Sequence, residues 1–162
     1  MSLGENLGKD ETLTDDEYKD LLQQVSRKLF GSEVATVLGS CLEFRPCPSV
    51  EFWRDLILSG RDQDLGANLL SVLLPWINIT DLVCRLLEAA PGNNLWERQA
   101  GTTAWYAACG GSIEIPSGEH FDMKEAVDRT RLTEAIRCAL QSFKDPKHRD
   151  SLQRALNCLS TP

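Results

Sequence analysis

Short stretches of helical periodicity, each bounded by start and stop signals, are the feature that most constrains the fold of this 162-residue chain. Leucine and other apolar residues recur three and four positions apart, which places them on one face of a helix. Thr14-Asp15-Asp16-Glu17 is a typical capping box before the first stretch, and Pro91-Gly92 is a typical stop after the fifth. No run alternates apolar and polar residues at a period of two. The pattern predicts an all-α protein.

About eight helices are expected, in a compact bundle. Their approximate ranges are 14–30, 32–44, 49–60, 62–75, 78–90, 94–110, 122–143 and 145–159. The helices are short and often interrupted, which favours a bundle over a coiled coil. A stacked helical-repeat layout stays open, although no residue pattern repeats at a fixed period. Residues 112–120 predict a loop or a short extended piece.

The expected helices divide the chain into three parts. Residues 1–12 are polar and contain two glycines, which predicts a flexible tail. Residues 13–91 carry the most leucine-rich helices and are expected to form one bundle. Residues 92–162 are expected to form an additional helical subdomain packed on the first.

Composition and charge exclude several classes of partner. The chain is 42% hydrophobic and 25% charged, an ordinary globular balance, and its formal net charge is -7. That charge argues against nonspecific binding to nucleic acid or to an anionic membrane surface. The apolar runs are too short for membrane insertion, and no leader segment is visible, so a cytoplasmic protein is expected.

Six cysteines occur, none in a Cys-x-x-Cys pair, and most fall within expected helices. A chain of this length can build a hydrophobic core without a disulfide framework. We therefore expect buried, reduced thiols, and disfavour disulfides or a metal site.

The search for catalytic chemistry points away from an enzyme. His120, beside Glu119 and Asp122, is the one arrangement that resembles a general base, and it stays open as a minor alternative. The sequence has no His-Glu-x-x-His motif, no calcium loop and no phosphate-binding loop. We expect no catalytic residues, no cofactor and no metal.

Two clusters of charge lie far apart in the sequence. Asp16 and Asp20, with their acidic neighbours, form an acidic face on the first expected helix, and could contact a basic partner. The stretch 144–149 contains two lysines, a histidine and an arginine. An acidic and a basic surface on one molecule would permit head-to-tail assembly. The sequence does not determine the oligomeric state.

Residues 14–90 resemble a death-effector domain, a member of the six-helix death fold. Five segments carry the likeness: Tyr18 to Leu29, Ser32-Glu33-Val34 with Cys41-Leu42, Phe52 to Gly60, Leu69 to Trp76, and Thr80-Asp81-Leu82-Val83. The resemblance implies a six-helix bundle, with a very short third helix within residues 44–50. It also implies a non-enzymatic adaptor or regulator that makes homotypic contacts in apoptotic or innate-immune signalling.

The same resemblance nominates contact residues. Glu33 matches the acid of the family's charge triad, and Asp81 matches the aspartate of its Arg-x-Asp-Leu motif. Ile79 stands where the family has the arginine, and Gly39 stands where it has an exposed aromatic residue. The predicted partner-binding residues are therefore Glu33 and Asp81, together with the acidic-face residues Asp16 and Asp20.

Two other functions stay open. The chain could be an unrelated helical binding protein, such as an inhibitor or toxin-immunity protein that uses its acidic face. It could also be a Bcl-2-like regulator, because Trp96-Glu97-Arg98 with Cys109-Gly110-Gly111 is similar to the central helix of that family, although Glu97 replaces the motif's glycine. Stacked helix pairs would favour the unrelated binding protein, and a Greek-key bundle over residues 14–90 would favour the death fold.

Overall fold

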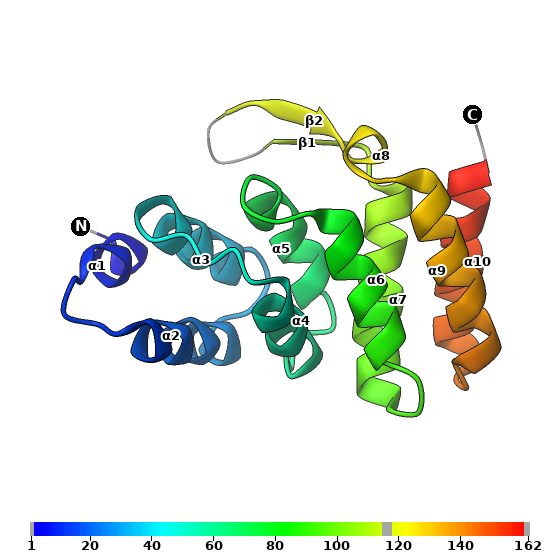
Figure 1. Ribbon diagram of the computed structural model, residues 1–162, viewed down its shortest axis with the longest axis horizontal. Helices are drawn as coiled ribbons and strands as arrows, with labels where there is room; N and C mark the ends of the chain where they lie inside the picture. The colour runs from blue at the N-terminus through cyan, green and yellow to red at the C-terminus, as the bar shows by residue number, and fades with distance from the viewer. Residues whose placement is uncertain (1, 115–117, 161–162) are drawn as a thin grey trace.

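The computed structural model describes residues 2–114 and 118–160, which contain ten helices and one short hairpin (Figure 1). The all-α prediction is confirmed. The helices are α1 (Leu3–Lys9), α2 (Asp15–Lys28), α3 (Ser32–Phe44), α4 (Val50–Leu58), α5 (Leu65–Leu73), α6 (Ile79–Ala89), α7 (Asn94–Cys109), α8 (Met123–Ala126), α9 (Arg129–Ser142) and α10 (Pro146–Ser160). Strands β1 (Ser112–Glu114) and β2 (His120–Asp122) pair antiparallel within the stretch expected to be a loop or extended piece.

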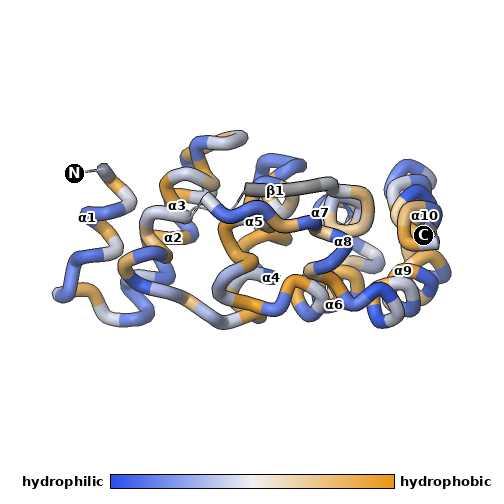
Figure 2. The backbone as a smooth tube through the Cα atoms, turned by 90° about the horizontal axis from the view of Figure 1, so that it is seen from above, coloured by the Kyte–Doolittle hydropathy of each residue, from blue (hydrophilic) through white to orange (hydrophobic). Residues whose placement is uncertain are grey.

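The helices are stacked side by side in two layers. One layer contains α1, α3, α5, α7 and α10, each packed on the next, and the other contains α2, α4, α6 and α9. Figure 1 shows the row from α1 at one end to α10 at the other, and Figure 2 shows it from above. Short turns join each helix of the second layer to the next helix of the first. The layout is the stack of helix pairs that the sequence left open.

A single core runs between the layers and through both predicted parts of the chain. Trp53 of α4 is the largest fully buried side chain, and its indole N–H donates to the carbonyl oxygen of Cys47 at 2.7 Å. On the other side of the core, α7 presents buried alanines at 100, 104, 107 and 108. Their small side chains let α5, α6 and α10 pack closely around α7.

Gly66 of α5 lies close against Thr103 of α7. A Cβ atom there would overlap the Thr103 hydroxyl oxygen and lie 3.2 Å from Cγ2 of Ile57. We expect Gly66→Ala to lower the free energy of unfolding by about 1–3 kcal/mol, because the overpacked core must shift. Chemical denaturation followed by circular dichroism measures it. Gly111→Ala, with nothing within 4 Å of the new atom, is the matched control, and equal stability of the two variants would contradict the packing argument.

Residues 3–9, within the range predicted to be a flexible tail, form helix α1. Gly4 and Gly8 are buried against α3: a Cβ atom on Gly4 would lie 2.5 Å from Cβ of Ser40, and one on Gly8 would lie 2.7 Å from the Cys41 carbonyl oxygen. The two glycines that suggested a tail instead permit this close helix contact.

The prediction of a single helix over residues 122–143 is wrong in one respect. The helix breaks after Ala126, and the chain forms two helices, α8 and α9. Asp128 caps α9 by accepting from the Arg131 amide at 3.1 Å, and its own amide donates to the Thr80 hydroxyl at 2.9 Å. These bonds direct the chain back onto α6. The death-fold resemblance places a short third helix within residues 44–50. Residues 45–49 are not helical, and Phe44 and Val50 are the last residue of α3 and the first of α4.

Candidate protein-binding surface

Polar contacts link the turns at one end of the stack. Asp62, in the turn between α4 and α5, accepts through Oδ2 from the amide of Gly31, in the turn between α2 and α3, at 2.9 Å. Gln99 of α7 donates from Nε2 to the Asp62 carbonyl oxygen at 2.6 Å. Each helix pair is thereby tied to the next.

Glu97 makes the last of these links. Its side chain is only 2% exposed, and its carboxylate accepts from three backbone amides: Gly92 at 3.0 Å, Lys144 at 2.7 Å and Asp145 at 3.4 Å. Two of the amides lie at the start of α10, where the helix dipole also favours an anion. Glu97 therefore joins the α6–α7 turn to the α9–α10 turn.

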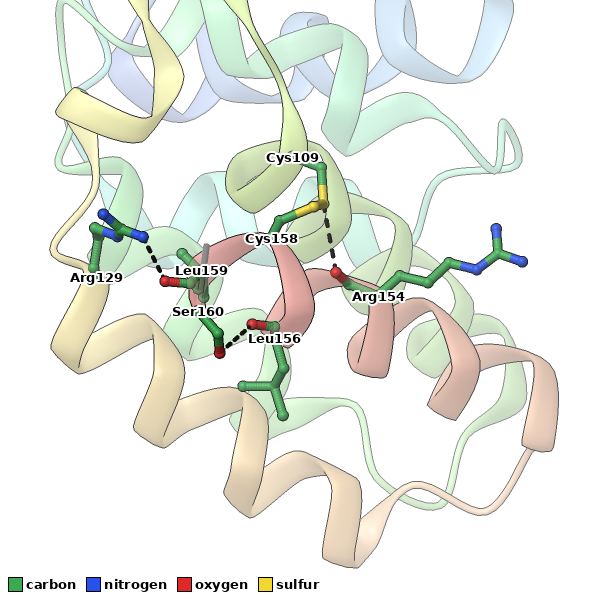
Figure 3. Close-up of a disulfide and its surroundings, with 7 residues drawn as sticks. All are labelled: Cys109, Arg129, Arg154, Leu156, Cys158, Leu159 and Ser160. Carbon is green, nitrogen blue, oxygen red and sulfur yellow. Dashed lines mark hydrogen bonds between the residues drawn. A yellow bond between two sulfur atoms is a disulfide. The ribbon is translucent and has the colours of Figure 1, made fainter. Parts of the chain in front are cut away.

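Helices α7 and α10 run parallel and are joined at both ends. At their starts, Oδ1 of Asn94 lies 3.1 Å from Nε2 of His148. At their ends, a disulfide links Cys109 to Cys158, with a Cα–Cα distance of 5.5 Å (Figure 3). Near the middle, a Cβ atom on Gly101 would lie 3.4 Å from the His148 carbonyl oxygen, so the helices are close there too. The pair is a rigid platform.

The disulfide corrects the expectation that all six cysteines are reduced. Cys109 and Cys158 meet because both close parallel helices. The prediction of a buried thiol is confirmed for Cys41, Cys47 and Cys84, and is wrong for Cys138, which is exposed on α9. Burial raises the pKa of the Cys41 thiol to about 11 and also raises the pKa of Cys47 and Cys84.

Large apolar side chains are exposed at the start of the platform. Leu95 is 64% exposed and Trp96 is 38% exposed, although both immediately precede the buried Glu97. The side chains of Arg98, Lys144 and Lys147 are exposed nearby, and no ion pair is recorded for them within residues 2–114 and 118–160. We call these five residues the α7–α10 patch. The Glu97–Lys144 and Asn94–His148 contacts bring its two halves together.

The four residues predicted from the sequence do not form one site. Asp81, at the start of α6, pairs with Arg131 of α9 at 2.6 Å, whereas Glu33 is exposed in the first turn of α3. Asp16 and Asp20 are exposed near the start of α2. Glu33 follows the turn at the other end of α2, and the helix between the two ends is roughly 20 Å long. The basic stretch at 144–149 was visible in the sequence, but its apolar neighbours at 95 and 96 were not assigned to it.

The surroundings of Asp81 differ from those implied by the resemblance. Ile79 is buried, and the guanidinium beside Asp81 comes from Arg131 in the second half of the chain. The bond to Asp81 raises the pKa of Arg131. Gly39 is also buried, in α3, where the resemblance implies an exposed aromatic side chain. The Asp81–Arg131 pair lines a shallow groove of about 570 Å³ with Arg54, Arg85 and Glu88.

The remaining candidate, His120, is not part of a metal-binding group among the described residues. His120 is exposed on β2, and the described part of the chain holds no group of three or more His, Cys, Asp or Glu side chains placed to bind a metal. Among the described helices, none has the length and apolar character needed to cross a bilayer.

The chain was compared with protein families, curated proteins and solved structures. No protein-family model, curated protein or solved structure matches this chain.

Proposed function

We propose that this protein is a non-enzymatic binding protein that recognises another protein through the α7–α10 patch. The observation that carries the proposal is the exposure of two adjacent apolar side chains, Leu95 and Trp96, at the start of the platform. Adjacent exposed apolar side chains with a polar rim are typical of protein-interaction sites. Tryptophan and arginine are among the residues that contribute most to binding energy in such interfaces.

The surroundings of the patch suit this role. The Asn94–His148 contact and the buried Glu97 hold the backbone at the patch, and the disulfide joins the far ends of the same two helices, so little order has to be gained on binding. Burial of Leu95 and Trp96 would supply affinity, and the three cations around them would steer an acidic partner.

The stacked helix pairs support the broader class, a helical binding protein, over a death-fold adaptor in particular. An adaptor in apoptotic or innate-immune signalling, located in the cytoplasm, stays a proposal that rests on the sequence resemblance. Homotypic contacts of that kind would use Glu33 and Asp81, and Asp81 would have to exchange its bond with Arg131 for one with a partner.

The test compares two pairs of surface substitutions. Leu95→Ser with Trp96→Ser removes the apolar centre of the patch, and Phe30→Ser with Phe121→Ser removes exposed apolar side chains outside α7 and α10. Partners are identified by affinity purification, and binding is then measured by calorimetry with the purified partner. We expect the patch substitutions to weaken binding about thirtyfold or more and the control pair to have little effect. Undiminished binding by the patch variant would refute the proposal.

A further inference from the structure

We infer that the α7–α10 patch binds the acidic start of α2 from a second copy of this chain, giving head-to-tail assembly. The inference rests on the proposed function and names its partner. Arg98, Lys144 and Lys147 are exposed, and within the described residues no carboxylate is paired with them. The chain has 24 acidic residues and 17 lysines and arginines, so three cations without an ion-pair partner stand out. The patch thus combines exposed apolar side chains with three cations that have no ion-pair partner among the described residues.

Matching anions lie on α2. Two of its four early acids are already engaged: Asp15 pairs with Arg45 at 2.8 Å, and Glu17 accepts from the Thr14 amide at 3.1 Å. Asp16 and Asp20 are exposed one helical turn apart, and no ion pair joins either of them to another described residue. Half-buried Leu13 directly precedes this turn and adds apolar atoms beside the acids.

The two surfaces cannot meet within one molecule. Helix α2 lies toward one end of the row and α10 closes the other, with α4 to α7 between them (Figure 1). The acids of α2 can therefore reach these cations only from another copy. Two different surfaces at opposite ends make a heterologous contact, which leaves a free acidic and a free basic end on every oligomer that does not close into a ring. Growth into longer chains is expected, with dimers as the first step.

Charge reversal provides a sharp test. Sedimentation velocity is measured over a wide concentration range for the full chain, for Lys144→Glu with Lys147→Glu, and for Asp16→Lys with Asp20→Lys. We expect the unmodified chain to associate as concentration rises and each variant alone to stay monomeric. A mixture of the two variants is expected to associate, because each reversed surface then meets an opposite charge. High salt should weaken every association.

A control separates local contact from net charge. Lys28→Glu with Arg61→Glu changes the net charge by the same amount as Lys144→Glu with Lys147→Glu, at exposed positions outside both surfaces. This control variant is expected to associate like the unmodified chain. A chain that stays monomeric at every concentration would overturn the inference, as would association unaffected by Lys144→Glu with Lys147→Glu or a mixture that fails to associate. The proposed function is tested separately. It holds after any of those outcomes if a different protein binds the unmodified chain and binds the variant with Leu95→Ser and Trp96→Ser more weakly.

Discussion

Replacing Glu97 with alanine is expected to lower the free energy of unfolding by about 3–5 kcal/mol, from the loss of a buried, fully bonded carboxylate. The substitution leaves three backbone amides, those of Gly92, Lys144 and Asp145, without their acceptor. It also creates a cavity where two turns meet. Urea denaturation followed by circular dichroism and tryptophan fluorescence measures the change.

Two further substitutions at glutamate show whether the carboxylate itself is responsible. Glu97→Gln keeps the shape and one acceptor oxygen, so a smaller loss of about 1–2 kcal/mol is expected. Glu134→Ala removes an exposed glutamate from α9 and is expected to change stability by less than about 0.5 kcal/mol. If Glu97→Ala matched Glu134→Ala, Glu97 would not be the link between the turns.

The helices that the sequence predicted well are those with strong local signals. The capping box at the start of α2 is present as expected, with the Thr14 hydroxyl accepting from the Glu17 amide and the Glu17 carboxylate accepting in return. Asp145 likewise caps α10 through the Lys147 amide. Such signals act between residues two or three positions apart, so a single sequence contains all the information they need.

Features that depend on distant residues could not be predicted in this way. Gly4 and Gly8 weaken a helix by propensity, and only the facing surface of α3 makes α1 stable. The break at Asp128 depends on a hydroxyl group 48 residues earlier in the chain. Periodicity indicates which face of a helix is buried, and it does not indicate which helix covers that face.

The candidate surface was visible only in part for the same reason. The basic stretch near Lys144 could be found from composition, whereas its approach to Leu95 depends on the buried carboxylate of Glu97. The burial of Glu97 could not be predicted from the sequence, because a glutamate in the first turn of a helix is usually exposed and is favoured there by the helix dipole. A buried charge of this kind becomes evident only when the turns it connects are known.

Removing the disulfide is expected to lower the free energy of unfolding by about 4 kcal/mol, because Cys109 and Cys158 close a loop with a sequence separation of 49. Cys109→Ser with Cys158→Ser tests this by urea denaturation, and Cys138→Ser, which removes an exposed free thiol, is the control. A reducing agent should bring the unmodified chain to the stability of the double variant and leave that variant unchanged. Because the disulfide joins the ends of α7 and α10, its loss should also raise amide hydrogen exchange in α10 more than in α4. Equal stability of the unmodified chain with and without reductant would show that the two helices are held by packing and by the Glu97 and Asn94–His148 contacts alone.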